Sequence, residues 1–386
     1  MPSIAESKPL WQYRFWLVCI CAGMLVFFAQ VAALYPVLPV YLTQRWGEDA
    51  PVGLVVGAMA AGLLCFRPGI GILIDRWGRK RVLWMGLLMM LGILPLYGWS
   101  PTPSWLMGVR VLHGISQAAL ATASQTMLAD LVPPKDRTAM LGYLAMSNTI
   151  GFSLGPLLGS YLFATGGLTT LLLWLFGLTI VGLGISLALP ESRSSDRSHL
   201  PQAGISSGFP WRYILSFPVR DATFIFFVGS FLHGAVITFL PLFVNNSALF
   251  YSLNAFVAIL VRFGLGRWGA IVPQRWIISI SIFCSGSGLI GLSQFPEGLI
   301  FWSILYGLGF GMLFPVLSAI VSLAAPVKVR GRVYSFFLAG FDGGMTLGGA
   351  GIQPLTQLLP LGSLFAGLGG LGCGISYIAF RRFSRH

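Results

Sequence analysis

The stretch Gly71-Ile-Leu-Ile-Asp75-Arg76-Trp77-Gly78-Arg79-Lys80-Arg81 is a short, strongly basic segment between two long apolar runs, 52–74 and 82–100. Gly78 suits a tight turn, and Asp75 lies close to the start of the second run, where a helix N-terminus favours an anion. A loop this short between two runs of about 20 apolar residues predicts a pair of helices that cross a membrane and return.

The rest of the chain extends this pattern. Of its 386 residues, 56% are hydrophobic and only 9% are charged, whereas an average soluble domain has about 25% charged residues. So few charges could not cover a water-soluble fold of this size, which excludes a soluble enzyme or a nucleic-acid binder. The chain therefore predicts an all-α polytopic membrane protein. Twelve apolar runs are long enough to span a bilayer: 15–42, 52–74, 82–100, 105–129, 138–165, 168–189, 222–244, 247–265, 276–293, 298–324, 333–358 and 361–380.

Basic residues are concentrated in alternate loops. If the N-terminus is cytoplasmic, the cytoplasmic segments hold 20 of the 24 lysines and arginines, and the outer loops hold only Arg45. Because cytoplasmic loops carry the excess of basic residues, this bias predicts that both termini are cytoplasmic. Trp211 and Tyr213 indicate a short helix at the membrane interface. The expected segments are a tail at 1–14, six helices in 15–189, a cytoplasmic linker at 190–221, six helices in 222–380 and a tail at 381–386.

The two sets of six runs resemble each other. The offset between matching positions is 195 residues early in each set and 193 after the loop that follows the fourth run. The matching basic pair, Arg67 and Arg262, lies inside apolar runs. Repeated halves are typical of secondary transporters, whose solute site lies near the midplane between the halves. The glycines that match are Gly114 with Gly309, Gly151 with Gly344 and Gly155 with Gly348.

Four segments resemble the major facilitator superfamily. Residues 71–81 resemble its signature loop, Gly-x-x-x-Asp-Arg-x-Gly-Arg-Lys/Arg, and residues 110–114 (Arg-Val-Leu-His-Gly) are similar to its Arg-x-x-x-Gly pattern. Residues 130–137 resemble its related Asp…Arg loop. Residues 151–159 resemble the antiporter pattern of its drug and metabolite exporters. The resemblance covers all twelve runs and implies two pseudo-symmetric six-helix halves.

The same resemblance implies an ionic latch. In this family the acid at the position of Asp75 joins a contact between the halves that stabilises the outward-facing state. The alternative is that the basic loop only anchors the ends of the spans. The predicted latch residues are Gly71, Asp75, Arg76, Gly78, Arg79, Lys80, Arg81, Asp130 and Arg137.

Gly151, Gly155 and Gly159 recur every four residues and so form one smooth stripe on a helix. Pro156 removes a helix hydrogen bond and predicts a kink. The resemblance implies that the stripe limits proton leak, while ordinary close packing is the alternative. The second half has Gly349 in place of the proline.

Asp342 is the only acid well inside a predicted span. It lies nine residues into the run 333–358, about 14 Å along a helix at about 1.5 Å per residue. A carboxyl inside the membrane is a functional candidate, here a proton carrier. The alternative is an ion pair that steadies the helix, with Arg262 or a cytoplasmic basic residue.

Three further ionisable residues complete the proton-coupling candidates. Arg110 lies within an apolar run and should face the interior of the bundle, because a charge in lipid is costly. The resemblance gives it a role in proton coupling or in helix packing. His113 is one turn away on the same face, and His233 lies near the midplane. Five other polar residues lie mid-span and either line a cavity or bond between helices: Gln30, Gln117, Asn148, Asn254 and Tyr306.

The sequence thus predicts a secondary active transporter that works by alternating access. The favoured activity is proton-coupled export of an amphipathic, drug-like or metabolite solute, such as a siderophore or a sugar. An importer or facilitator on the same fold is one alternative, and a non-transporting sensor or assembly factor is another. An enzyme is not expected, and neither is a metal or cofactor, since the sequence has no metal-ligand cluster, nucleophile with a base or nucleotide loop. We expect a monomer in the bacterial inner membrane that interacts with solute, protons and lipid, and not with nucleic acid.

Overall fold

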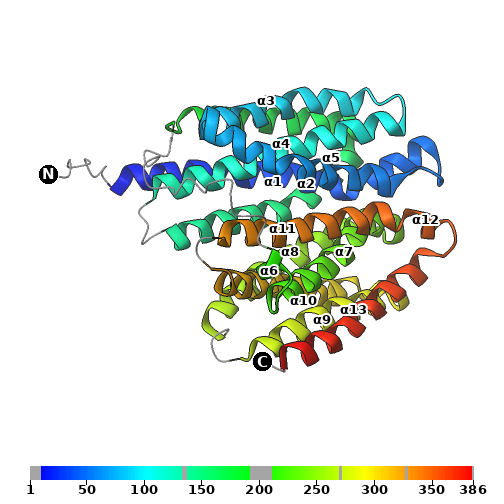
Figure 1. Cartoon of the computed structure of the whole chain (residues 1–386). Coiled ribbons are helices and arrows are strands. Elements are labelled where there is room, and N and C mark those ends of the chain that lie inside the picture. The colour runs from blue at the N-terminus through cyan, green and yellow to red at the C-terminus, as the bar shows by residue number, and fades with distance from the viewer. Residues whose placement is uncertain (1–9, 133–136, 192–210, 269–271, 327–328, 385–386) are drawn as a thin grey trace.

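The computed structural model describes residues 10–132, 137–191, 211–268, 272–326 and 329–384. Every regular element in these residues is a helix. Figure 1 shows the helices as one elongated bundle, in which α1 begins and α13 ends on the same side. The elements are α1 (Leu10–Trp46), α2 (Val52–Trp77), α3 (Arg79–Gly98), α4 (Pro103–Leu131), α5 (Arg137–Leu187), α6 (Trp211–Ile214), α7 (Val219–Phe243), α8 (Ser247–Trp268), α9 (Gln274–Gln294), η1 (Pro296–Gly298), α10 (Leu299–Ala324), α11 (Arg330–Thr346), η2 (Leu347–Gly351), α12 (Gln353–Thr356) and α13 (Leu361–Ser384).

The described helices make twelve crossings. Nine segments are long and apolar enough to span a membrane, and one of them, Met140–Leu187, holds two crossings because its backbone leaves helical values at Gly166 and Gly167. The other two crossings are α4, whose hydropathy is lowered by Arg110 and His113, and α11, which has 17 residues before the helix widens. The predicted break between the fifth and sixth spans is thus confirmed.

Two crossings differ in detail from the sequence prediction. The first runs over Leu10–Trp46 and not 15–42, so it extends beyond the predicted bounds at both ends. The eleventh is divided into α11, the π-helical turn η2 and the short α12. Three glycines in η2 explain the wider turn, because glycine adopts irregular backbone conformations easily. The short helix predicted around Trp211 is confirmed as α6.

The glycine stripe packs within the first half, which comprises α1–α5. A Cβ atom added at Gly155 would overlap the Ala29 carbonyl oxygen, and the other two stripe glycines also face α1. In the second half, α7–α13, the matching Gly348 faces the Phe231 carbonyl of α7 in the same way. The match at an offset of 193 therefore reflects equivalent helix pairs. The match of Gly114 with Gly309 does not reflect equivalent helix pairs, since Gly114 faces α2 whereas Gly309 faces α9.

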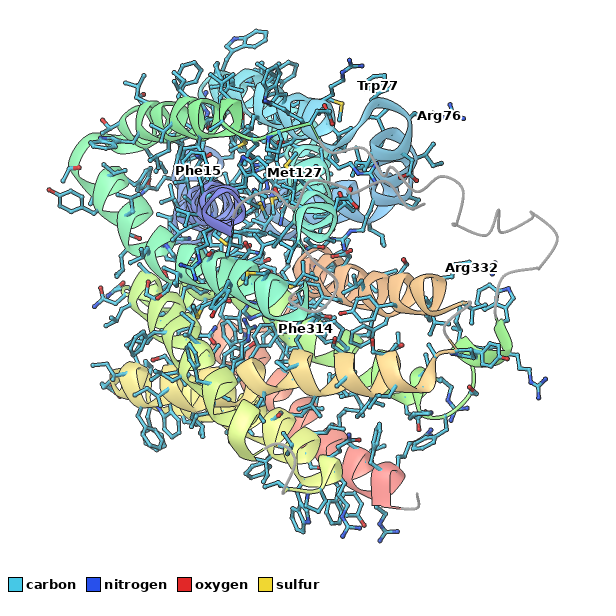
Figure 2. All side chains as sticks on the ribbon, turned by 90° about the vertical axis from the view of Figure 1, so that its left-hand side faces the viewer. Phe15, Arg76, Trp77, Met127, Phe314 and Arg332 are labelled. Atoms are coloured by element: carbon cyan, nitrogen blue, oxygen red, sulfur yellow. The ribbon has the colours of Figure 1, made fainter. Side chains whose placement is uncertain are left out.

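Within the part of the chain that the structure describes, the buried apolar clusters of the two halves join at one end of the bundle and are separate at the other. We call the end of the bundle where Arg76, Arg81 and Arg381 lie the basic end, and the other the opposite end. One buried cluster at the opposite end combines side chains of both halves, for example Val55 with Leu240. Towards the basic end, each half has a separate cluster. Figure 2 views the molecule from the basic end.

Close backbone contacts between α2 and the eleventh crossing explain the joined core. The Gly53 amide donates to the Gln353 Oε1 atom, and a Cβ atom on Gly57 would lie 3.3 Å from the Ala350 Cβ atom. Most buried residues of α2 lie within 52–63, nearest the opposite end. The halves are therefore packed together at the opposite end.

Candidate functional site

An ion pair links the two halves between α2 and α11. The Arg67 Nη2 atom lies 3.4 Å from the Asp342 Oδ2 atom, and the two side chains are 35% and 7% exposed. The sequence alternative proposed an ion pair of Asp342 with Arg262 or a cytoplasmic basic residue. That partner was wrong, because Asp342 pairs with Arg67. α11 begins at Arg330, which places Asp342 deeper than predicted, about 18 Å along the helix at about 1.5 Å per residue.

The repeat-related arginine also reaches across to the other half. The Arg262 Nη1 atom on α8 donates to the Thr149 Oγ1 atom on α5 at 2.6 Å. At the offset of 193, Thr149 is the position that matches Asp342. The pseudo-symmetry thus gives two equivalent contacts, one between charges and one to a neutral hydroxyl. Sequence reasoning missed Thr149, although the offset applied to Asp342 would have found it.

Arg110 faces the interior of the bundle and is 2% exposed. Its Nη2 atom donates to the Val56 carbonyl oxygen at 3.2 Å, and its Nη1 atom donates to the Tyr97 hydroxyl at 3.4 Å. The same hydroxyl lies 2.9 Å from the His113 Nδ1 atom. Arg110, Tyr97 and His113 thus form one buried polar cluster in the first half.

Arg110 also lines a small cavity between the halves. The cavity holds about 30 Å³ and is lined from α1, α2, α4, α7 and α11. The cavity wall also contains two side-chain hydroxyls, those of Tyr35 and Thr238. A space of this size holds about one water molecule, so the halves are nearly closed around it. The remaining lining residues are Val56, Gly57, Met59, Ala60, Gly234, Ile237 and Met345.

His233 lies within the second half and contacts α10. Its Nδ1 atom is 3.2 Å from the Tyr306 hydroxyl, and its ring stacks on Phe310 with 3.9 Å between ring centroids. The structure therefore pairs each of the two histidines that the sequence singled out, the buried His113 and the half-buried His233, with a tyrosine hydroxyl.

The five mid-span polar candidates lie outside the lining of this cavity. Gln30 accepts a hydrogen bond from the Thr179 hydroxyl at 3.0 Å, which ties α1 to α5 inside the first half. Three others have buried carbonyl oxygens with no hydrogen-bond partner among the described residues: Gln117, Asn148 and Asn254. The fifth, Tyr306, bonds His233.

The family of the chain follows from comparison with known proteins. The chain matches the family model of the Major Facilitator Superfamily over residues 20–252, which is more than half of its length. The chain belongs to the Major Facilitator Superfamily. It is therefore a multi-pass membrane protein and a secondary transporter, in a family of transporters and not of enzymes. The predicted family is confirmed.

Two bacterial transport proteins are similar to most of the chain. The staphylopine export protein of Staphylococcus aureus is 24% identical over 350 residues, 87% of this chain and 88% of that protein. The multi-drug resistance efflux pump PmrA of Streptococcus pneumoniae is 23% identical over 349 residues, 82% of this chain and 84% of the pump.

Solved superfamily structures confirm the predicted fold. The nucleoside transporter NupG aligns with a TM-score of 0.74 and 17% identity over 96% of this chain and 99% of NupG. A peptide transporter, POT, in complex with alafosfalin aligns with a TM-score of 0.77 and 15% identity over 96% of this chain and 95% of that chain.

The superfamily signature loop is bound to the first half in this structure. The Arg79 Nε atom lies 2.8 Å from the Asp130 Oδ2 atom at the end of α4. The Lys80 Nζ atom donates to the Leu187 carbonyl oxygen at 3.1 Å, and its backbone amide donates to the Glu191 carboxylate at 3.2 Å. Sequence reasoning missed Glu191, which follows the last turn of α5.

Asp75, the acid of the predicted latch, is 79% exposed and lies 4.0 Å from Arg79 on its own loop. Within the described side chains it has no ion pair with the second half. Gly78 has φ 98°, which explains why glycine ends α2 there. The side chain of Arg137 lies outside the described residues. The remaining latch residues are Gly71, Arg76 and Arg81, of which the two arginines are exposed.

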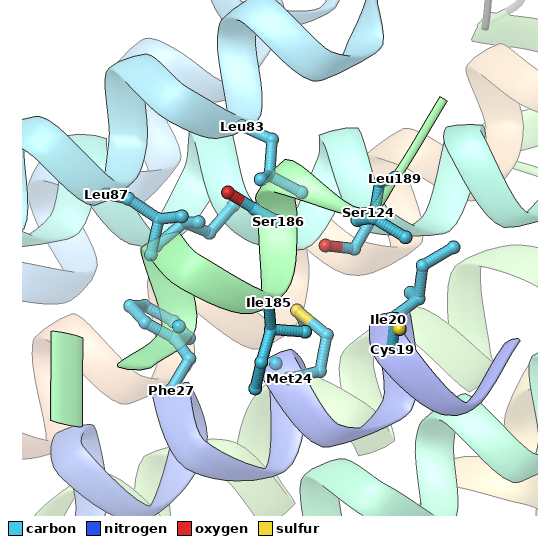
Figure 3. Close-up of a pocket in the computed structure, with 13 residues that line it drawn as sticks. Cys19, Ile20, Met24, Phe27, Leu83, Leu87, Ser124, Ile185, Ser186 and Leu189 are labelled. Atoms are coloured by element: carbon cyan, nitrogen blue, oxygen red, sulfur yellow. The ribbon is translucent and has the colours of Figure 1, made fainter. Parts of the chain in front are cut away.

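A second cavity of about 30 Å³ lies inside the first half, between α1, α3, α4 and the second arm of α5. Figure 3 shows Met24 and Leu87 pointing into it, with the Ser124 and Ser186 hydroxyls at its border. No charged residue lines it. It therefore differs in character from the cavity beside Arg110.

Proposed function

We propose that this superfamily member exports a small organic solute in exchange for protons, by alternating access. The observation that carries the proposal is the joining of the two cores at one end and their separation at the other. A transporter that opens to one side at a time needs halves that part at one end while they stay packed at the other. Export is favoured because the two relatives described above are named for export and efflux.

We assign the basic end to the cytoplasm, with both termini there, and the two six-helix halves to residues 15–189 and 222–380. The bias of basic residues towards alternate loops supports this orientation. In it, the structure is the inward-facing state, closed at the opposite end. Asp75 then joins the latch only after the basic ends of the halves close, consistent with its exposure and local pairing here.

The orientation is tested by labelling single cysteines with a membrane-impermeant thiol reagent in whole cells. The five native cysteines are first replaced by serine. A cysteine at Glu297 should then react from outside, whereas one at Arg381 should react only after permeabilisation. Labelling of the Arg381 position in intact cells would reverse the orientation.

We assign the coupling proton to Asp342. Protonation neutralises its carboxylate, which weakens the contact with Arg67 and lets α2 and α11 separate. Loss of the proton restores the contact. Because solute and proton bind the inward and outward states differently, each shifts their populations. His113 and His233 stay secondary candidates, since each already lies within hydrogen-bond distance of a tyrosine hydroxyl.

The test uses everted membrane vesicles that contain a pH-sensitive dye and are acidified inside by respiration. An exported solute added outside should enter in exchange for protons and restore the dye signal. The panel includes staphylopine and several drugs, because the relatives are a staphylopine export protein and a multi-drug efflux pump. Sugars, amino acids and siderophores complete the panel. Vesicles without the protein are the control.

Three results would contradict the proposal. Absence of a response to every panel member would reject proton-linked export of these classes. Uptake of a solute only into right-side-out vesicles would favour an importer. A full response from Asp342→Asn would remove that carboxylate from the coupling step.

A further inference from the structure

Arg110 is a buried guanidinium with no carboxylate partner in the described part of the chain. Its contacts are a carbonyl oxygen of Val56 and the hydroxyl of Tyr97, both neutral. Its Nε atom is buried and has no hydrogen-bond partner among the described residues. A charge held within a membrane span without a counter-charge is costly, so this position calls for an anion that the chain does not provide.

The place where an anion could reach Arg110 is the cavity between the halves. Arg110 forms part of its wall, opposite residues of α7 and α11, and no acidic residue lines it. The Tyr35 hydroxyl in the same wall can donate to a bound oxygen, whereas the Thr238 hydroxyl already donates to the Gly234 carbonyl oxygen at 2.8 Å. The space is small in this state and is positioned to widen when the halves move apart.

The balance of charges inside the spans also indicates an anionic ligand. Three arginines lie there, Arg67, Arg110 and Arg262, against one acid, Asp342. Asp342 is already paired with Arg67. Arg262 bonds only the neutral Thr149, and its Nε atom is buried without a partner among the described residues. Two guanidiniums thus remain without a counter-charge in this part of the chain.

We infer that the transported solute is an organic anion whose carboxylate binds Arg110 in the cavity between the halves. Guanidinium and carboxylate form two parallel charge-assisted hydrogen bonds, and the Nε atom of Arg110 is free to make one of them. The apolar wall, with Met59, Ile237 and Met345, suits a hydrophobic body attached to that carboxylate. A cationic solute would be repelled by Arg110. This inference rests on the proposed transport function and adds the charge class of the solute.

The experiment measures the unfolding temperature of the purified full-length protein at neutral pH and fixed ionic strength. The probes are matched triplets of acid, amide and amine built on phenyl, indolyl and naphthyl groups. At least one acid should raise the unfolding temperature in a saturable way, while its amide and amine should not. Stabilisation by amides or amines equal to that by acids, or no stabilisation by any acid, overturns the inference.

Variants then locate the anion site. Arg110→Gln should weaken binding of the acid about tenfold or more, since a hydrogen bond to a charged group contributes about 1.5–3 kcal/mol. Arg110→Lys, which keeps the charge, should restore part of the binding. Arg45→Gln, which removes the same charge from an exposed position, is the matched control and should bind as the parent does. Acid binding that survives Arg110→Gln overturns the inference.

Two further measurements distinguish failure of this inference from failure of the proposed function. If Arg110→Gln does not fold, as shown by size-exclusion chromatography, the acid–amide comparison on the parent protein and the Arg110→Lys variant still decide. Proteoliposomes with an imposed proton gradient test the proposed function independently. Transport of amines but not acids would leave the proposed function intact and reject this inference. Acid binding without any proton-driven transport would support the anion site at Arg110 and reject the proposed function.

Discussion

Arg67 and Asp342 join the two halves through an ion pair, and Arg262 and Thr149 make the repeat-related contact through a neutral hydroxyl. The two contacts occupy equivalent places in the duplicated fold, yet only one contains an acid. A proton can therefore weaken the contact of α2 with α11 without a similar effect on α5 and α8. Among the described residues, this asymmetry leaves one ion pair between the halves, and it is the contact that a proton would weaken.

Asp342→Asn should abolish proton-driven export while exchange of labelled for unlabelled solute persists. The amide keeps the size of the side chain but cannot exchange a proton. Stability should fall by no more than about 1 kcal/mol, because Arg67 is about a third exposed and water screens the pair. Export driven by a pH gradient and solute exchange are both measured in proteoliposomes.

A matched control for this variant is Asp221→Asn, which removes a carboxylate that binds Arg220 and Arg382 near the basic end. It should retain proton-driven export. If exchange disappeared together with proton-driven export in Asp342→Asn, Asp342 would have a general role in conformational change or solute binding and not a specific one in coupling.

Thr149→Asp should convert the neutral contact into a second ion pair. The Arg262 Nη1 atom already lies 2.6 Å from the Thr149 hydroxyl, so a carboxylate there would meet a guanidinium. We expect stabilisation of this state by up to about 1 kcal/mol, which would slow its conversion about fivefold. Thermal unfolding and transport rate measure the two effects. Thr149→Asn is the uncharged control, and a transport rate equal in both variants would contradict the symmetry argument.

Gly155→Ala should lower the free energy of unfolding by about 1–3 kcal/mol, the usual cost of adding a methyl group to a filled space. Its Cβ atom would overlap the backbone of Ala29 on α1. Gly142→Ala is a matched control on the same helix, where nothing lies within 4 Å of the added atom. That change should be neutral or stabilise by about 0.5–1 kcal/mol. Equal unfolding temperatures for the two variants would reject tight packing of the stripe.

The sequence was sufficient to predict the twelve crossings and the resemblance between the two sets of six. Apolar runs of bilayer length and basic loops are local features that need no three-dimensional information. Glycines such as Gly155 and Gly348 could be matched because close helix packing leaves a pattern at helical spacing. The π-helical turn η2 was not predicted, because a change in hydrogen-bond register has no comparable pattern in composition.

The contacts between the halves could not be predicted from the same patterns. Residues such as Arg67 and Asp342 are far apart in the chain, and which of several arginines meets the acid depends on the tilt of four helices. The cavity beside Arg110 was missed for the same reason, because Tyr35 and Thr238 look like ordinary helix residues in the sequence.

A disulfide between cysteines at positions 57 and 350 should hold the opposite end closed. A Cβ atom on Gly57 would lie 3.3 Å from the Cβ atom of Ala350, close to the separation of about 3.5–4.5 Å found in disulfides. In a protein without its five native cysteines, Gly57→Cys with Ala350→Cys should form the bond on mild oxidation and lose transport. Reduction should restore transport, because the bond blocks the outward-facing state and its cleavage lets α2 and the eleventh crossing separate again.

The control is each substitution alone, Gly57→Cys or Ala350→Cys, in the same protein without its native cysteines. Neither single variant can form the bond, so each should keep transport after oxidation. The Gly57→Cys variant also measures any direct effect of that side chain on the cavity, which Gly57 lines. If the oxidised pair at positions 57 and 350 also transported at the parent rate, the opposite end would not need to open, and alternating access about α2 and the eleventh crossing would be wrong.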